Sequence, residues 1–196
     1  AALDQVREQS VHALGFWRFV QWRFWVQWQR LRAYAHQQGI AVVGDAPIFV
    51  AHHSADVWAH AQQFLLDDRL EPHVVAGVPP DYFSPTGQRW GNPLYNWEVM
   101  ARDGFRWWKD RLVHQFRQVD VVRLDHFRGF EAHWEIPADE PTAVAGRWRH
   151  GPGLAFFEAI QDELGPLPII AEDLGMITPE VTALREACGY PGMRIL

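Results

Sequence analysis

The sequence has little of what would mark a secreted, membrane-bound or nucleic-acid-binding protein. Its single cysteine, Cys188, excludes a disulfide within the chain, which fits a reducing compartment, and we expect a cytoplasmic location. No apolar run approaches the roughly 18 residues of a membrane-spanning helix. The start, AALDQVREQS, lacks the charged and apolar blocks of a signal peptide. With 18 basic against 24 acidic residues and no basic stripe, nucleic acid is not an expected partner.

An initiator methionine is also lacking and the sequence closes on GMRIL, so we expect a piece of a longer protein. Its 196 residues, 48% of them hydrophobic, suffice for one sizeable core, and we see no domain boundary, repeat or low-complexity tract. Tryptophan, in contrast, is abundant, with 11 residues. Such residues pack cores, and flat aromatic rings also complement the apolar faces of sugars, so both interpretations stay open at this point.

Helical and strand patterns alternate along the chain. Apolar residues at steps of three and four, with their end signals, predict helices over residues 17–35, 105–116, 154–164 and 178–189. The first of these has the spacing of an amphipathic helix, and Gly39 stands just after its end. Short apolar segments predict strands over 40–45, 119–125 and 166–173, with another opening at 193–196. This alternation predicts an α/β fold with a parallel sheet, either open or closed into a barrel.

Polar residues stand where three of these strands end. They are Asp45, the run from Arg123 to His126, and Glu172. In a parallel sheet, open or closed, ligands bind beyond the carboxyl ends of the strands. Arg123 and Asp125 are two residues apart and therefore share a strand face. An adjacent guanidinium favours an ionised aspartate, and a positioned carboxylate can act as a nucleophile.

Asp125 and Glu172 together suggest a catalytic pair. Neighbouring strands lie roughly 4.8 Å apart, so two inward carboxyl groups at equal height would approach the separation of about 5–5.5 Å that a retaining glycosidase needs. Asp125 would attack the anomeric carbon, while Glu172 would protonate the leaving oxygen and then deprotonate the acceptor. Two other interpretations stay open: an ion pair of Arg123 and Asp125 beside a solvated acidic turn, and a metal site of Asp125, His126 and Glu172.

The connection between Asp45 and the second helix is far longer than the usual length of about 2–6 residues. Its stretch 77–97 is dense in glycine, proline and aromatic residues. Long ordered loops over a strand end usually serve function. We therefore interpret the segment at about 46–97 as a long substrate-binding loop insertion, with His52 and His53 as exposed loop residues.

Four stretches of the sequence resemble the motifs of a known family. They are GDAPIFVA (44–51), PPDYFSPTGQRWGNPLY (79–95), VVRLDHFRGF (121–130) and IIAEDLG (169–175). In sequence and order they are similar to motifs of the 4-alpha-glucanotransferases, also called amylomaltases or disproportionating enzymes, which form glycoside hydrolase family 77 within the α-amylase clan. The resemblance implies a parallel (β/α)8 TIM barrel, of which this chain covers roughly the third to fifth strands and the start of the sixth. Residues 1–196 would then be the central part of a single catalytic domain.

The resemblance implies roles for the residues at the strand ends. Asp125 matches the nucleophile, and Glu172 matches the acid/base. Arg123 matches the arginine that orients the nucleophile. His126 matches a histidine that contacts the sugar at or beside the cleavage point. Asp45 matches an aspartate near the first donor subsite, although a residue of this kind can also simply cap a turn.

The same resemblance assigns roles within the long insertion. Gln88 and Trp90 fall in the part that contacts sugars around the scissile bond. Tyr82, Phe83 and Ser84 match the gating part of the loop. The structural alternative for Trp90, Tyr82 and Phe83 is packing within the loop itself.

The implied activity is the retaining transfer of an α-1,4-glucan segment to the 4-hydroxyl of an acceptor through a covalent glycosyl-enzyme. The expected partners are malto-oligosaccharides, glucose and α-1,4-glucans, and the chemistry needs neither a metal nor an organic cofactor. The family also uses a third carboxylate, in a His-Asp pair near the seventh strand, and the sequence ends before it. We therefore expect residues 1–196 to be inactive by themselves.

Two alternative functions stay open. An α-amylase-type hydrolase uses the same two carboxylates, but the amylase pattern places a histidine five residues after Asp45, where Val50 stands. A glucan-binding fragment without activity would bind malto-oligosaccharides and leave them unchanged.

Overall fold

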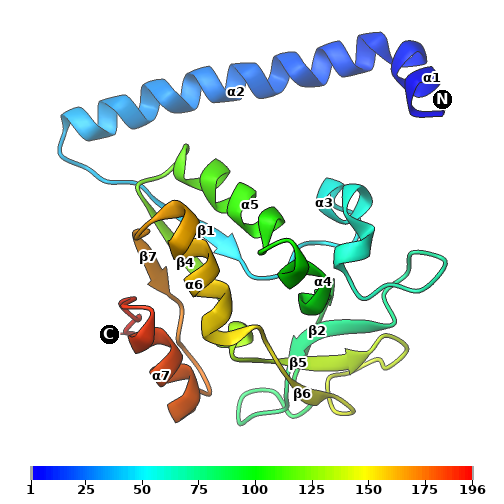
Figure 1. Ribbon diagram of the computed structural model, residues 1–196, viewed down its shortest axis with the longest axis vertical. Coiled ribbons are helices and arrows are strands. Elements are labelled where there is room, and N and C mark those ends of the chain that lie inside the picture. The colour runs from blue at the N-terminus through cyan, green and yellow to red at the C-terminus, as the bar shows by residue number, and fades with distance from the viewer. Residues whose placement is uncertain (1, 196) are drawn as a thin grey trace.

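The computed structural model describes residues 2–195, which form two β-sheets with helices around them (Figure 1). The helices, including the 3-10 helices η1 and η2, are α1 (Ala2–Gln9), α2 (Val11–Gln37), α3 (Ala55–Ala59), η1 (Ala61–Gln63), α4 (Trp97–Arg102), α5 (Arg106–Phe116), η2 (Phe127–Phe130), α6 (Gly153–Leu164) and α7 (Pro179–Ala187). The strands are β1 (Val43–Pro47), β2 (Val74–Val78), β3 (Gln88–Pro93), β4 (Val121–Asp125), β5 (Ala132–Pro137), β6 (Arg147–His150) and β7 (Ile169–Ala171). Within these residues, no helix combines the length and the apolar character that crossing a membrane requires.

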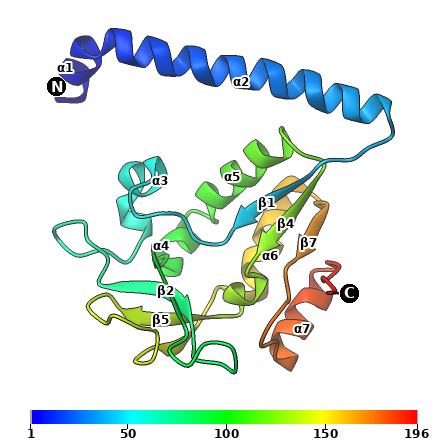
Figure 2. The ribbon, with the colours of Figure 1, turned by 180° about the vertical axis from the view of Figure 1, so that it is seen from behind.

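Strands β1, β4 and β7 form a parallel sheet in that order, as the alternation of helices and strands predicts. Helices α5 and α6 cover one face of this sheet, and Figure 2 shows the opposite face with no helix over it. The strand residues on the covered face are apolar and buried: Ala46, Val122, Leu124, Ile169 and Ala171. The opposite face is open in the part of the chain that the structure describes, and it carries the polar side chains predicted for the site.

Strands β3, β2, β5 and β6 form a second, antiparallel sheet in that order, beyond the carboxyl ends of the parallel strands (Figure 1). The sequence did not predict this sheet. Strands β2 and β3, with α3 and η1, belong to the segment 46–97, so its interpretation as one long loop is wrong. These strands are short, contain glycine and proline, and change register, which hides the alternation of side chains that reveals a strand.

Aromatic rings make up much of the core between the sheets and the helices. Trp108, Phe130 and Phe156 are buried and contact one another, with ring centroids 4.9 to 5.5 Å apart. Tyr95 is buried beside them and donates its hydroxyl hydrogen to the carbonyl of Ile48 at 2.7 Å. Burial raises the pKa of Tyr95 well above its usual value, so the phenol stays neutral. These rings position the loop that follows β1, which leads away from the candidate site.

Helix α2 contacts the rest of the described chain near its C-terminal end (Figures 1 and 2). There, Trp28 donates its indole N–H to the carbonyl of Gln118 at 2.8 Å, and Arg32 forms an ion pair with Asp120. The helix was predicted correctly, but no residue of it is buried, and its apolar side chains point in several directions instead of forming one stripe. The amphipathic prediction is therefore wrong. A helix that is apolar on all sides is normally one that other segments surround.

Most element boundaries agree with the prediction to within a few residues, and Gly39 has the left-handed conformation expected after a helix end. The strands differ more, because pairing with β4 rather than apolar composition determines where β1 and β7 begin and end. The strand expected at 193–196 is absent over residues 193–195, and residue 196 lies outside the described range. Just before these residues, the carbonyl of Pro191 accepts a hydrogen bond from the N–H of Ala171 at 2.9 Å. This bond attaches the end of the described chain to the edge of β7.

Candidate active site

Asp45, Arg123 and Asp125 meet on the open face of the parallel sheet. The register of β1 and β4 pairs Asp45 with Arg123 and places Pro47 beside Asp125. Arg123 contacts an oxygen of Asp45 through Nε at 2.7 Å and an oxygen of Asp125 through Nη2 at 2.8 Å. Burial alone would lower the pKa of Arg123, but its bonds with both carboxylates outweigh burial and raise that pKa. Because its carboxylate pairs with Arg123 across the strands, Asp45 is not a simple turn cap.

Glu172 follows β7 directly and lies on the same face. The register of β4 and β7 ends with Leu124 beside Ala171, so Asp125 and Glu172 are the next residues along two strands that lie roughly 4.8 Å apart. The backbone N–H of Glu172 donates to the carbonyl of Leu124 at 3.0 Å, which continues the strand pairing past the end of β7. Its carboxyl oxygens accept the backbone N–H groups of His126 at 2.9 Å and Leu174 at 3.1 Å. The backbone therefore fixes the orientation of this side chain.

His126 connects Asp125, which precedes it in the sequence, with Glu172, which accepts its backbone N–H. Its φ of 54° is rare for a residue other than glycine, and it directs the backbone N–H toward Glu172. Burial lowers the pKa of the ring to about 4, so the imidazole is neutral at pH 7. Its Nε2 atom is buried and has no hydrogen-bond partner among residues 2–195. This unpaired polar atom belongs to the residue that follows Asp125 in the sequence.

Trp90 lies in an irregular part of β3. At this point β3 has two more residues than the facing part of β2, and Gly91 supplies a positive φ of 82° that other residues rarely adopt. The bulge turns the Trp90 ring toward His126, with the ring centroids 4.8 Å apart and the planes at 84°. The indole N–H donates to the side-chain oxygen of Gln88 at 3.0 Å. The structure thus brings Gln88 and Trp90 to His126, the residue that follows Asp125.

Tyr82, Phe83 and Ser84 lie on the loop between β2 and β3. Tyr82 is 94% exposed and Phe83 is 91% exposed, so packing within the described residues does not explain them. Their rings contact each other at 5.5 Å. Ser84 is held locally, because its hydroxyl donates to the carbonyl of Gly87 at 2.7 Å and its N–H donates to Asp81 at 2.7 Å. These three residues are not in contact with the carboxylates in this structure.

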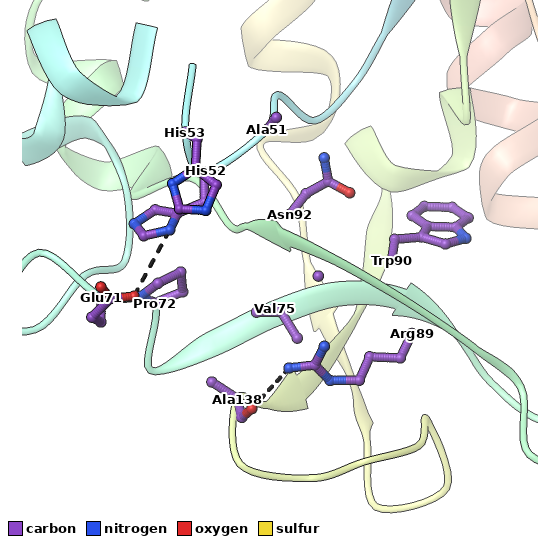
Figure 3. Close-up of a pocket in the computed structure, with 11 residues that line it drawn as sticks. Ala51, His52, His53, Glu71, Pro72, Val75, Arg89, Trp90, Asn92 and Ala138 are labelled. Carbon is purple, nitrogen blue, oxygen red and sulfur yellow. Dashed lines mark hydrogen bonds and ion pairs between the residues drawn. The ribbon is translucent and has the colours of Figure 1, made fainter. Parts of the chain in front are cut away.

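A cavity of about 440 Å³ is lined by Trp90 but by none of the carboxylates of the site, and most of its polar residues were not predicted (Figure 3). Its polar lining comes from His52, His53, Glu71, Arg89 and Asn92. His52 is largely covered and donates from Nε2 to the carbonyl of Leu70 at 2.8 Å, so its interpretation as an exposed residue is wrong, whereas His53 is exposed. The sequence showed only the histidine pair, since the other residues come close through the fold.

Among residues 2–195, no three histidine, cysteine, aspartate or glutamate side chains are grouped as a metal site requires. The alternative metal site of Asp125, His126 and Glu172 is therefore not formed. These residues are instead engaged by an arginine and by backbone N–H groups.

The fold and the site define an α/β protein with a carboxylate cluster at the carboxyl ends of a parallel sheet. The family model of glycoside hydrolase family 77, described as 4-alpha-glucanotransferase, matches residues 1–196, and the chain belongs to this family.

Relatives with this description are similar along the whole chain. The 4-alpha-glucanotransferase of Thermus thermophilus is 55% identical over 195 residues, and that of Streptococcus pneumoniae is 52% identical over 196. The structure of an amylomaltase from Streptococcus agalactiae in complex with acarbose matches 99% of the chain with a TM-score of 0.96 and 41% identity. The chain therefore has the α/β fold of that amylomaltase. It spans 39% of the length of each of these three proteins.

Proposed function

We propose that the full-length protein containing this chain is a 4-alpha-glucanotransferase. It transfers a segment of an α-1,4-glucan to the 4-hydroxyl of glucose or of a malto-oligosaccharide, with retention at the anomeric carbon. The observation that carries this proposal is the register of β4 and β7, which makes Asp125 and Glu172 neighbours on one open face. Membership of the family and the relatives' descriptions support it.

In this mechanism Asp125 attacks the anomeric carbon while Glu172 gives a proton to the departing glycosidic oxygen. A covalent bond joins the glucan to Asp125, and the leaving segment departs with its new hydroxyl group. Glu172 then takes the proton from an acceptor 4-hydroxyl, whose oxygen displaces Asp125. Two displacements restore the α configuration. Arg123 would hold Asp125 in line for attack, with Asp45 on the other side of the guanidinium.

Transfer outcompetes hydrolysis only if the acceptor is better positioned than water. The neutral His126 ring, with its unpaired Nε2, suits a sugar hydroxyl beside the reacting bond. Trp90 and Gln88 lie next to it. The exposed rings of Tyr82 and Phe83 would cover the bound sugars and exclude water when the loop closes over them.

We also propose that the parallel sheet belongs to a (β/α)8 barrel, with β1, β4 and β7 as its third to fifth strands. Residues 1–196 would be the central part of one catalytic domain, and the segment 46–97 would be its substrate-binding insertion. The open sheet face would then be the barrel interior, where two carboxyl groups can face one sugar linkage. The location in the cytoplasm stays a prediction.

Incubation of the full-length protein with maltotriose tests the activity. Transfer yields glucose together with longer oligosaccharides, whereas an α-amylase-type hydrolase only shortens the substrate. Asp125→Asn and Glu172→Gln should each lower the rate by at least about a thousandfold. Asp162→Asn and Glu158→Gln, on the exposed side of α6, are matched controls that should keep it.

A fluorinated glucosyl donor with a good leaving group tests the intermediate. We expect mass spectrometry to find the added sugar on the peptide that contains Asp125. Binding of maltotriose without products of either kind would instead favour the glucan-binding protein without activity.

A further inference from the structure

The cavity of Figure 3 shares a wall with a second cavity. The first, of about 440 Å³, reaches from Trp90 to His52, His53 and Glu71. The second, of about 640 Å³, begins at the same three residues and ends at Trp58 on α3. The two cavities are therefore adjacent along one side of β3 and α3, and we call them together the outer groove.

The wall that the two cavities share is built by a tight turn over residues 67–71. Asp67 accepts the backbone N–H groups of Arg69 at 2.8 Å and Glu71 at 3.0 Å. Leu70 has a φ of 65°, which is unfavourable for a branched side chain, and its carbonyl accepts the hydrogen of His52 Nε2. A strained residue that persists is held by its surroundings. Here the strain aims a carbonyl at His52 and places Glu71 beside the groove.

The outer groove offers many hydrogen-bonding groups to a ligand with many hydroxyl groups. Glu71 brings one negative charge, Arg69 and Arg89 bring one positive charge each, and the histidines and Asn92 add further donors and acceptors. Arg89 is anchored by a bond from Nη2 to the carbonyl of Ala138 at 2.8 Å. An exposed aromatic ring among such polar groups can cover the apolar face of a sugar, and Trp58 is 74% exposed.

The groove also begins where the candidate active site ends. Trp90 belongs to both, because its ring points away from His52 and His53 in Figure 3 and contacts His126 on the other side. The groove therefore lies on the far side of Trp90 from His126.

We propose that the outer groove binds the remote glucosyl units of long α-1,4-glucans, with Trp58 as the stacking platform and His53 and Glu71 as hydroxyl partners. This inference rests on the proposed function for its choice of ligand. In this proposal the outer groove determines the preference of the enzyme for long substrates, because long glucans make contacts there that maltotriose does not make.

Kinetics of the full-length protein with two substrates test the inference. For Trp58→Ala and His53→Ala we expect KM for maltoheptaose to rise about three- to tenfold, as for the loss of one stacking contact or hydrogen bond. The kcat for maltoheptaose and both constants for maltotriose should stay unchanged. Trp58→Phe keeps an aromatic face and should restore most of the affinity. His114→Ala, an exposed histidine on α5, is the control for His53→Ala.

Calorimetry with maltoheptaose separates this inference from the proposed function. If the wild-type protein does not disproportionate maltotriose, the proposed function fails, but weaker maltoheptaose binding by Trp58→Ala would still support the groove. If the protein is active and all variants keep the wild-type KM for maltoheptaose, the groove proposal is wrong. An equal change for maltotriose and maltoheptaose would also overturn it, because the residues would then act at the reacting bond or on the fold.

Discussion

Replacement of Arg123 by glutamine is the most direct test of how the carboxylate cluster is held. Arg123 forms ion pairs of 2.7 and 2.8 Å with Asp45 and Asp125, so the substitution removes both and leaves two carboxylates facing each other. The three side chains are 29%, 49% and 39% exposed, and solvent therefore screens the charges. Each pair should stabilise the fold by at most about 1 kcal/mol, which gives a loss of about 1–2 kcal/mol in the free energy of unfolding.

The effect on catalysis should be much larger than the effect on stability. A nucleophile that is misplaced by about 1 Å can lose about a hundredfold in rate, so we expect kcat for maltotriose to fall about a hundredfold with KM changed less than threefold. Glucose release and urea denaturation of the full-length protein measure the two quantities. Arg123→Lys keeps the charge but lacks the planar guanidinium group that contacts two carboxylates at once. Its kcat should therefore lie between those of the wild type and Arg123→Gln. A kcat within threefold of the wild type for Arg123→Gln would contradict the idea that this arginine orients Asp125.

Three further predictions concern the fold that supports the site. Tyr95→Phe removes a buried hydrogen bond and should lower the free energy of unfolding by about 1–2 kcal/mol in urea denaturation. Gly77→Ala would push a methyl group into the backbone of β3, so we expect a loss of about 2 kcal/mol or more and a reduced kcat, because Trp90 moves with β3. The pKa of Asp120 is held well below its usual value, first by the backbone N–H of Val42 and then by side chains of α2. Its stabilisation is thus present above the unfolded pKa of about 3.9 and lost as the pH falls further. Asp120→Asn should therefore be less stable than the wild type at pH 7, and the difference between the two urea midpoints should shrink progressively as the pH falls below about 3.9.

The parts of the fold with regular periodicity were predictable from the sequence. Helices over 105–116 and 154–164 follow from apolar residues at helical spacing, and the pairing of Arg123 with Asp125 follows from the alternation of side chains in a strand. The order of the strands β1, β4 and β7 follows from the helices between them. The spacing of apolar residues in a helix and the alternation of side chains in a strand depend on residues close together in the chain, so a single sequence is enough to predict these features.

The unpredicted parts depend on contacts between distant segments. The antiparallel sheet pairs β2 with β5, which are more than 50 residues apart in the sequence. In neither strand do apolar and polar residues alternate clearly enough to predict a strand. The hydrogen bond from His126 to Glu172 could not be predicted either. Its donor is a backbone N–H group, which every residue except proline has, so no residue type in the sequence indicates it. The outer groove also gathers its residues from four separate segments, and only the fold brings Trp58 and Trp90 to one surface.

Two exposed features of the chain have one physical explanation. The open face of the parallel sheet carries three carboxylates and an exposed Val43, and β1 and β7 are the edge strands of the sheet in the described residues. Helix α2 carries many large apolar side chains, and none of its residues is buried. Transfer in preference to hydrolysis requires a site that excludes water, and exposed apolar side chains of a helix usually have a cover. We therefore propose that further strands of the barrel and the segments around them supply both, and that residues 1–196 alone have no glucanotransferase activity. Robust disproportionation of maltotriose by the isolated chain would show that these residues already form a complete site.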